Sequence, residues 1–263
     1  MLVDFLVTNY RSIGREMKLS MVAGAPAAKR YGASYHTGNS LAPDILVAAA
    51  VFGANGAGKS TVIKALKFFQ DFVRRSVSLP KDGRLPHRFN KLTEDGAKVP
   101  TELELSFTHR GELFQYGFSL DRDRINSEWL YSRASKKLSR TRAIFTREYD
   151  PESETYSWYI NESAVPGERE TWRNSTRDNA LFLTTAVELN SETLTKPYDW
   201  IVNSLHVIGA SERIHPEFTA KAINESIEGV EKAEIIDFMR SLVTCSPECT
   251  RSQASAVHVV VHS

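Results

Sequence analysis

Hydrophobic residues change their spacing several times along the chain, and each change marks a different kind of element. Residues 2–8 and 17–22 are rich in β-forming side chains and predict two strands, with a turn at residues 9–14 between them. Residues 23–43 have no periodic pattern, which predicts a long irregular connection. A strand pair and a loop are therefore expected to open the chain.

An unbroken apolar run, residues 45–52, follows this connection. Apolar residues without alternation are typical of a strand that is covered on both faces of a parallel sheet, so we expect a central strand here. Residues 61–76 then place Ile63, Leu66, Phe69 and Val73 near one side of a helix. The pattern predicts a buried strand, a short connection and an amphipathic helix in succession.

Between residues 100 and 162 the pattern changes to alternation. Leu103, Leu105 and Phe107 alternate with polar residues, residues 114–120 do the same, and His109-Arg110-Gly111 reads as the turn between them. Further short strands are predicted at residues 125–131, 143–149 and 156–160. This part of the chain is therefore expected to be an antiparallel β-meander. Helical spacing returns at residues 168–189, 195–207 and 216–242.

Composition narrows the class of protein without naming a partner. The chain has 263 residues, 41% hydrophobic and 25% charged, which suits one sizeable α/β core or two small ones, and its net charge of +1 favours no particular ligand. No apolar run reaches the length of a membrane span and no basic leader is present, so we expect a cytoplasmic protein without a membrane partner. Cys245 and Cys249 are too few for a disulfide framework.

Residues 53–60 read GANGAGKS and match the spacing GxxxxGK[ST] of a phosphate-binding loop. Glycine lets backbone N–H groups approach phosphate oxygens closely, Lys59 supplies a point charge for the β- and γ-phosphates, and the Ser60 hydroxyl suits Mg²⁺. The following helix directs its positive N-terminal end at the same phosphates. The predicted cofactors are ATP and Mg²⁺, with Ser60 as the metal ligand. The predicted nucleotide-binding residues in this segment are Gly53, Ala54, Asn55, Gly56, Ala57, Gly58, Lys59, Ser60 and Thr61.

The N-terminal strand, the Asn-Tyr-Arg-Ser turn and the segment VFGANGAGKSTVIKAL together resemble the ABC-type ATPase heads of the RecF/SMC/OLD-like group. More narrowly, they are similar to bacterial AAA-type core-domain ATPases of phage-defence and abortive-infection systems. The resemblance covers residues 1–75, with weaker support to about residue 205. It implies that Asn9, Arg11 and Ser12 lie beside the nucleotide; the alternative is a capped surface turn.

The resemblance also implies an α/β fold: a P-loop NTPase core of the ABC-ATPase type with an antiparallel β-meander and flanking helices, apparently incomplete. The expected domains are a P-loop ATPase lobe (1–99), a β-rich subdomain (100–162), a helical region (163–240) and a divergent tail (241–263).

Several parts of such an ATPase are not visible in the sequence. We find no second-lobe signature, no apolar strand ending in Asp-Glu and no switch histidine, so the catalytic residue is unknown. We expect the chain to be the front part of a longer ATPase, truncated or shifted in frame near Ser241, with a natural short chain as the alternative. Glu188 and Asn190 could face the metal or simply end a helix. The basic residues between Arg133 and Arg147 could follow a nucleic acid or form a solvated hairpin.

The leading functional hypothesis is an ATP-binding P-loop ATPase domain whose hydrolysis depends on a second lobe or a dimer partner. A nucleotide-switched interaction module without catalysis and a small-molecule P-loop kinase are the alternatives. The expected partners are ATP and a second copy or partner subunit that completes the site, and nucleic acid is a further candidate partner.

Overall fold

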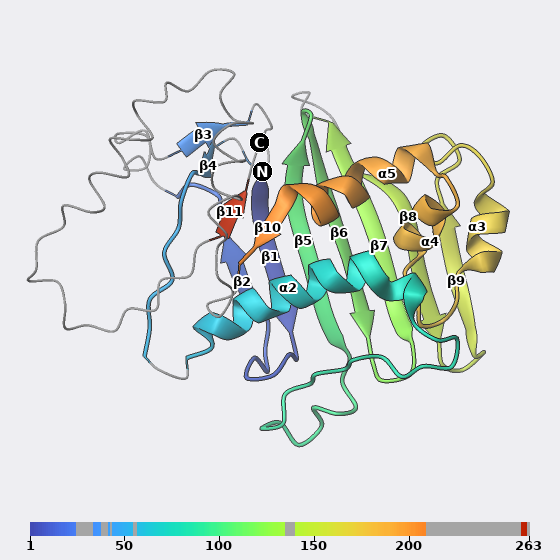
Figure 1. Cartoon of the computed structure of the whole chain (residues 1–263), viewed down its shortest axis with the longest axis horizontal. Coiled ribbons are helices and arrows are strands. Elements are labelled where there is room, and N and C mark those ends of the chain that lie inside the picture. The colour runs from blue at the N-terminus through green and yellow to red at the C-terminus, as the bar shows by residue number, and fades with distance from the viewer. Residues whose placement is uncertain are drawn as a thin grey trace, which may run out of the picture. The chain divides into compact units, whose positions relative to one another are not determined.

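The computed structural model describes residues 1–24, 34–37, 42, 44–54, 57–134, 140–208 and 259–261. Its main sheet has seven strands in the order β2-β1-β5-β6-β7-β8-β9 (Figure 1), and every neighbouring pair is antiparallel. The strands are Leu2–Thr8 (β1), Met17–Ser20 (β2), Thr101–His109 (β5), Glu112–Leu120 (β6), Ile125–Ala134 (β7), Arg142–Asp150 (β8) and Thr155–Ile160 (β9). The predicted N-terminal strand pair and the predicted meander are confirmed.

The turn between β5 and β6 forms where the sequence predicts it. His109 is paired with Glu112, and the two residues between them, Arg110 and Gly111, have positive φ angles of 49° and 75°. Two positive φ angles are what a tight hairpin turn needs to match the twist of its strands. Strand β1 of the expected P-loop lobe (1–99) and strand β5 of the expected β-rich subdomain (100–162) belong to one sheet. They pair from Leu2 opposite Phe107 to Thr8 opposite Glu102.

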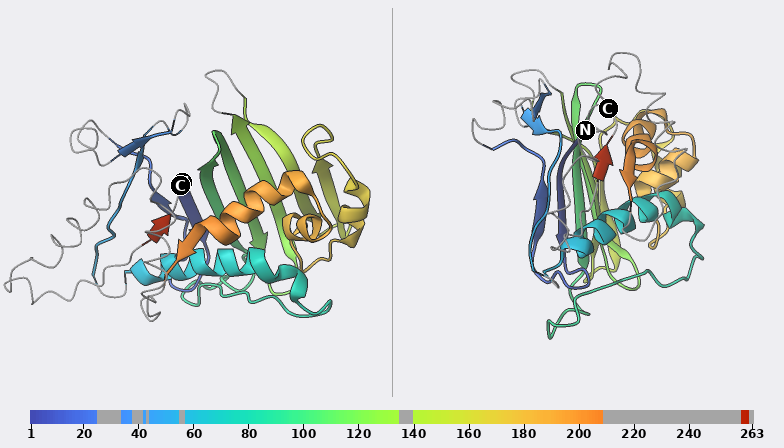
Figure 2. Two further views of the ribbon diagram at one scale, coloured as in Figure 1. Left: turned by 45° about the horizontal axis from the view of Figure 1, so that its top comes forward. Right: turned by 60° about the vertical axis from the view of Figure 1, so that its left-hand side comes forward.

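One long helix, α2 (Lys59–Arg75), lies across one face of this sheet and confirms the helix predicted at residues 61–76 (Figures 1 and 2). The Phe69 ring is the centre of the contact: its centroid lies 6.0 Å from that of Phe5, 5.9 Å from Tyr116 and 5.2 Å from Phe118. Aromatic rings at these distances pack closely and fix the position of the helix on the sheet.

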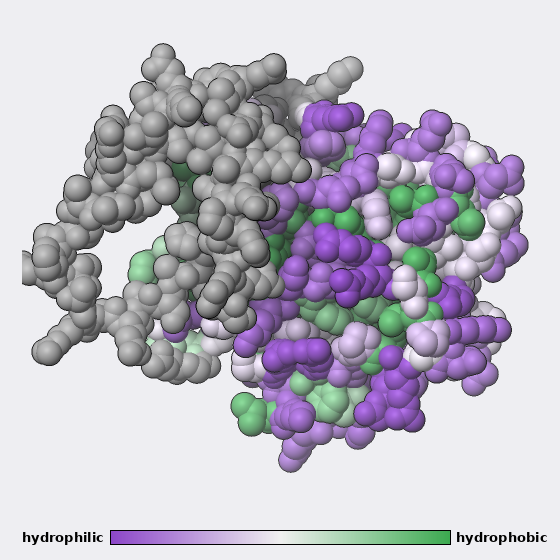
Figure 3. All heavy atoms as spheres, in the orientation of Figure 1, coloured by the Kyte–Doolittle hydropathy of each residue, from purple (hydrophilic) through white to green (hydrophobic). Residues whose placement is uncertain are grey.

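Three shorter helices accompany α2 on the same side of the sheet, as the right-hand view of Figure 2 shows. They are α3 (Arg169–Ser175), α4 (Phe182–Glu188) and α5 (Glu192–Asp199). The surface over these helices is largely hydrophilic, with hydrophobic patches between the helices (Figure 3). The apolar core therefore lies between the helices and the sheet.

The central strand expected at residues 45–52 is not formed, and this prediction is wrong. The strand β4 covers only Asp44–Leu46 and pairs antiparallel with β3 (Ser34–His36). Beyond it the apolar side chains are exposed, with Val47 at 60% and Phe52 at 82% of their full surface. A parallel strand needs hydrogen-bonding neighbours, and no strand among the described residues pairs with the chain from Val47 to Phe52.

The single helix expected at residues 168–189 is also wrong, because α3 and α4 are separate. Between them Arg177 Nη1 donates to the Leu79 carbonyl (2.9 Å) and Asn179 Nδ2 donates to the Pro80 carbonyl (2.7 Å). These side chains fasten the segment to the chain that leaves α2. Long-range hydrogen bonds therefore override the helical spacing of the sequence.

The helix expected at residues 195–207 begins earlier and ends earlier. After α5 the chain forms one π-helical segment, Trp200–Ser204 (η2), and then the strand β10 (Leu205–Val207), which pairs with β11 (Val259–Val261). The buried Gln70 amide of α2 donates to the carbonyls of Ile201 (2.9 Å) and Leu205. This side chain takes up backbone acceptors where the regular helix stops.

Some expectations lie outside the described residues. They concern most of the connection at 23–43, the helix at 216–242, and the two cysteines, Cys245 and Cys249. Residues Ile208–His258 form a unit separate from the rest of the chain, and only Ile208 of this unit is described.

Candidate nucleotide-binding site

The predicted phosphate loop leads directly into the first turn of α2. Gly58 is the residue before the helix and has φ 90° and ψ 0°, a left-handed conformation that glycine adopts without steric cost. The Gly58 carbonyl accepts the N–H groups of Thr61 (2.8 Å) and Val62 (3.2 Å), which starts the helix. Asn55 and Gly56 lie outside the described residues. The described part of the loop thus has the conformation that the motif predicts at Gly58.

Lys59 lies over the beginning of the loop. Its Nζ donates to the carbonyls of Gly53 (2.6 Å) and Ala54 (2.8 Å). The first turn of α2 contains no acidic residue, so the partial positive charge of the helix end is not neutralised there. The ammonium group and the helix end therefore place positive charge on the same side of the loop, as the binding of a phosphate chain requires.

The Asn-Tyr-Arg-Ser turn is held against this helix by Tyr10. The Tyr10 ring is buried, packs 5.5 Å from the Phe68 ring, and its hydroxyl donates to the Lys64 carbonyl (3.3 Å). Within the turn, Tyr10 and Ile13 exchange two backbone hydrogen bonds of 2.8 and 2.9 Å. The turn is therefore a rigid attachment between β1 and α2.

Ser12 and Arg11 occupy the tip of this turn, and the structure places Ser12 next to the phosphate loop. Ser12 Oγ lies 2.8 Å from Thr61 Oγ1. A Cβ added to Gly58 would lie 3.9 Å from Ser12 Oγ. Arg11 is exposed and has a positive φ of 52°, its N–H donates to the Arg88 carbonyl (2.7 Å), and its guanidinium lies 5.8 Å from the Tyr10 ring. The predicted residues on the turn and on the loop are therefore neighbours through Ser12.

Asn9 has a different position from the one that the resemblance implies. Its side chain is buried and donates to the carbonyls of Gly96 (2.8 Å) and Val99 (2.6 Å), while its Oδ1 accepts the Asn90 N–H (2.9 Å). These partners use both ends of the amide. Asn9 fastens the connection between α2 and β5 to the sheet, and the expectation that it faces a nucleotide is wrong.

In a comparison with protein families, the chain matches the model described as "AAA domain, putative AbiEii toxin, Type IV TA system" over residues 48–236. The chain belongs to this AAA family. The family implies a P-loop NTPase fold, which agrees with a phosphate loop at the start of α2, and it confirms the resemblance to AAA-type ATPases of abortive-infection systems. We find no match among curated proteins or among solved structures.

P-loop domains of the AAA type generally bind ATP with Mg²⁺, and the residues of this AAA domain fit both. Ser60 is exposed on the first turn of α2, next to Lys59, where a hydroxyl can meet a metal ion held by phosphate oxygens. The described residues contain no cluster of three His, Cys, Asp or Glu side chains suited to a metal. Magnesium in this AAA domain would therefore depend on the phosphates for most of its ligands.

Glu188 and Asn190 are not brought to the phosphate loop. Glu188 is the last residue of α4, and Asn190 lies two residues beyond it. The Thr184 hydroxyl of α4 donates to the Val73 carbonyl (2.7 Å), near the far end of α2. Val73 lies about 21 Å further along α2 than Lys59. Asn190 has a positive φ of 65°, which is common just after a helix. In this AAA domain the two residues end a helix, as the simpler reading of the sequence has it.

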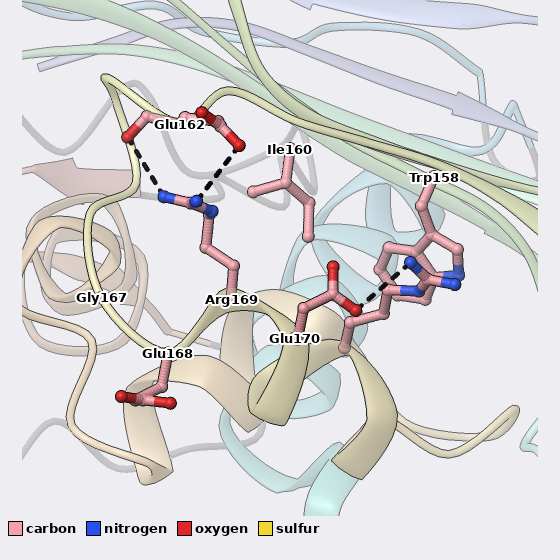
Figure 4. Close-up of a pocket in the computed structure, with 8 residues that line it drawn as sticks. Trp158, Ile160, Glu162, Gly167, Glu168, Arg169 and Glu170 are labelled. Atoms are coloured by element: carbon pink, nitrogen blue, oxygen red, sulfur yellow. Dashed lines mark hydrogen bonds and ion pairs between the residues drawn. The ribbon is translucent and has the colours of Figure 1, made fainter.

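A cavity of about 390 Å³ lies between β9 and α3, away from the phosphate loop. Figure 4 shows two pairs of its charged side chains in contact, whereas Glu168 points away from them: Arg169 donates to the Glu162 carbonyl and carboxylate, and Glu170 lies 3.5 Å from Arg173. Trp158 and Ile160 supply its apolar wall. Because both of its arginines are paired with glutamates, the cavity offers no unpaired cation for a phosphate.

A group of buried titratable side chains lies beneath α4. Glu128 is fully buried and accepts hydrogen bonds from the Tyr116 hydroxyl (3.0 Å) and the N–H groups of Phe182 (2.7 Å) and Leu183 (3.0 Å). Arg147 Nη1 lies 3.8 Å from its carboxylate. Burial raises the pKa of Glu128 above its ordinary value, while Arg147 opposes this shift.

Arg147 is therefore part of the core rather than of the basic strip suspected at Arg133 to Arg147. Its guanidinium donates to the Ala180 carbonyl (2.9 Å) and lies over the rings of Tyr156 (4.4 Å) and Trp158 (5.3 Å). The sequence analysis missed the pairing of Glu128 with Arg147. Both residues lie on strands whose apolar and polar positions alternate, and both fall at positions that face the core. This placement is the only sign in the sequence that the two side chains are buried.

Proposed function

We propose that this AAA domain binds ATP with Mg²⁺ at residues 53–61 and hydrolyses it only when a second lobe or a partner subunit completes the site. The observation that supports binding is the conformation at the start of α2, where Gly58 opens the helix and Lys59 lies over the loop. Ser12 and Arg11 would form the adjacent wall, because Ser12 contacts Thr61. Lys59 would hold the β- and γ-phosphates, and Ser60 would share the metal with them.

The need for a second lobe follows from what one loop can do. A phosphate loop binds the substrate and the transition state about equally well, and such uniform binding does not raise turnover. Phosphoryl transfer is accelerated mainly by positioning the nucleophile and by neutralising the charge that develops. In the described part of the chain, no carboxylate lies on the first turn of α2 to orient a water.

The exposed apolar segment before the loop supports the same proposal. Val47, Val51 and Phe52 are 60%, 43% and 82% exposed, although the sequence around them has the composition of a buried strand. Burying such side chains stabilises a protein by about 1.5–3 kcal/mol each. We propose that the completing lobe, from a second copy or another subunit, covers this segment.

Steady-state phosphate release by the purified chain tests the catalytic half of the proposal. We expect turnover near background, since one missing transition-state group is worth on the order of 10³ to 10⁵ in rate. Lys59→Ala is the control, because it removes the predicted phosphate contact and leaves the fold of α2 in place. A Lys59-dependent turnover of about one per second or more, without any partner, would contradict the proposal.

The same assay with added nucleic acid, together with a partner-binding measurement, separates the nucleic-acid link from the switch module. Stimulation by added DNA or RNA would support the nucleic-acid link that we propose for the complete ATPase, which we place in the cytoplasm. Among the helices in the described ranges, none is both long and apolar enough to cross a membrane. Nucleotide-dependent partner binding without any hydrolysis, even in the assembled complex, would instead favour a switch module.

A further inference from the structure

The face of the main sheet that carries no described helix presents an ordered row of side chains. Direct cross-strand partners run from Glu104 (β5) through Gly117 (β6), Trp129 (β7) and Thr146 (β8) to Tyr159 (β9). The helices gather on the opposite face (Figure 2, right). Partners opposite one another in an antiparallel sheet have their side chains on the same face. The row therefore lies across the face without a described helix, where Ile45 and Ala42 pack near Leu113, at the beginning of β6.

Trp129 lies flat on this face because Gly117 gives it room. A Cβ at residue 117 would be 2.4 Å from Cζ2 of the indole, closer than any side chain allows. The indole N–H donates to Glu104 Oε2 (2.8 Å), and this hydrogen bond fixes the orientation of the ring on the sheet surface. Trp129 is half-buried, with its inner side on the sheet. The outer side of the ring is held in one orientation before any partner arrives.

Three glutamates share the face of this indole, and Glu104 contacts the ring directly. Glu104 and Glu102 are two residues apart on β5, and Glu148 stands on β8 two positions from Thr146 on the same face. The pKa of Glu102 is raised by burial first and then by repulsion from Glu104 and Glu16. The neighbouring cation on β2, Lys18, is already bound to Asp4 at 3.1 Å. Among the described residues, this part of the face therefore carries more carboxylates than cations, and a further cation on it, Arg133, lies four residues along β7 from Trp129.

We propose that this face, defined by Trp129, Glu102, Glu104 and Glu148, binds an arginine-bearing segment of a partner protein. A guanidinium would stack on the outer side of the indole and pair with the carboxylates beside it. Arginine suits the surface better than lysine, because its planar group stacks on an aromatic face and still donates sideways to carboxylates. A nucleic acid fits less well, since its phosphates would meet carboxylates.

A fluorescein-labelled peptide of alternating arginine and glycine tests this proposal by anisotropy titration against the full chain. We expect Trp129→Leu and the double variant Glu102→Gln/Glu104→Gln to weaken binding about fivefold or more, and the matching lysine peptide to bind more weakly than the arginine peptide. Trp129→Phe keeps a ring over Gly117 but loses the indole N–H, so it should give a smaller loss. Circular dichroism confirms that each variant is folded.

The control is Glu152→Gln/Glu154→Gln, which removes two carboxylates from the exposed turn between β8 and β9. This variant should bind the arginine peptide within about twofold of the unchanged chain. Equal weakening by the control, or full binding by folded Trp129→Leu, would overturn the proposal. So would self-association that depends on Trp129 without peptide binding, which would assign the face to a second copy, and so would Trp129-dependent binding of single-stranded DNA.

Discussion

Replacing Glu128 with alanine should destabilise the domain more than the loss of any surface carboxylate. The substitution removes the acceptor for the Tyr116 hydroxyl and for the N–H groups of Phe182 and Leu183. It also leaves the Arg147 guanidinium buried beside a cavity, with its nearest carboxylate gone. All of these groups lie away from water, so none can exchange its lost partner for solvent.

The magnitude follows from the burial of both partners. Removing one member of a buried ion pair typically costs about 3–5 kcal/mol, so we expect about 4 kcal/mol for Glu128→Ala. The carbonyl of Ala180 and the rings of Tyr156 and Trp158 remain in contact with Arg147 and limit the loss. Removing both charges, in Glu128→Met/Arg147→Met, should cost less, because no buried charge is left without its partner.

Urea unfolding followed by circular dichroism measures these differences as changes in the free energy of unfolding. Glu148→Ala is the matched control, since Glu148 is an exposed glutamate on the adjacent strand β8, and it should change stability by less than about 0.5 kcal/mol. A Glu128→Ala variant within about 1 kcal/mol of the unchanged chain would refute the reasoning. So would a double variant that is less stable than the single one.

Three further predictions concern stability and its dependence on pH. Asn9→Ala removes the hydrogen bonds that the amide makes with the Gly96 and Val99 carbonyls and with the Asn90 N–H, and urea unfolding should show a loss of about 2–3 kcal/mol. Gly58→Ala forces a side chain into φ 90°, so we expect a cost of about 1–3 kcal/mol together with weaker ATP binding in calorimetric titrations. Burial raises the pKa of Glu128 above its ordinary value of 4.5, so the stabilisation from this shift is full below pH 4.5 and is lost as pH rises through the folded pKa. Glu128→Gln is neutral at every pH and should flatten this part of the plot of unfolding free energy against pH.

The elements that could be predicted from the sequence are those whose pattern is local. The alternation in β5 and β6, the Arg110-Gly111 turn and the apolar side of α2 each depend on neighbouring residues, and each is confirmed. The phosphate loop was predicted from a spacing of residue types, and the left-handed Gly58 agrees with it.

The remaining elements depend on contacts that no local pattern records. Helical spacing at residues 168–189 gives no sign that Asn179 will bond to Pro80 and Gly83 and interrupt the helix. The apolar run after Leu46 reads as a buried strand, yet its partner strands are not among the described residues. Asn9 could be placed on a turn from the sequence, but its bonds to residues some ninety positions away could not.

Binding of labelled ATP in the presence of Mg²⁺ tests the central claim most directly. The unchanged chain should bind ATP, and Lys59→Ala should bind it much more weakly, because Lys59 supplies the charge that lies over the loop. Lys67→Ala removes the same kind of side chain two turns further along α2, where it pairs with Asp71, and should bind like the unchanged chain. Equal binding by the Lys59→Ala variant and the unchanged chain would contradict the assignment of the phosphate loop.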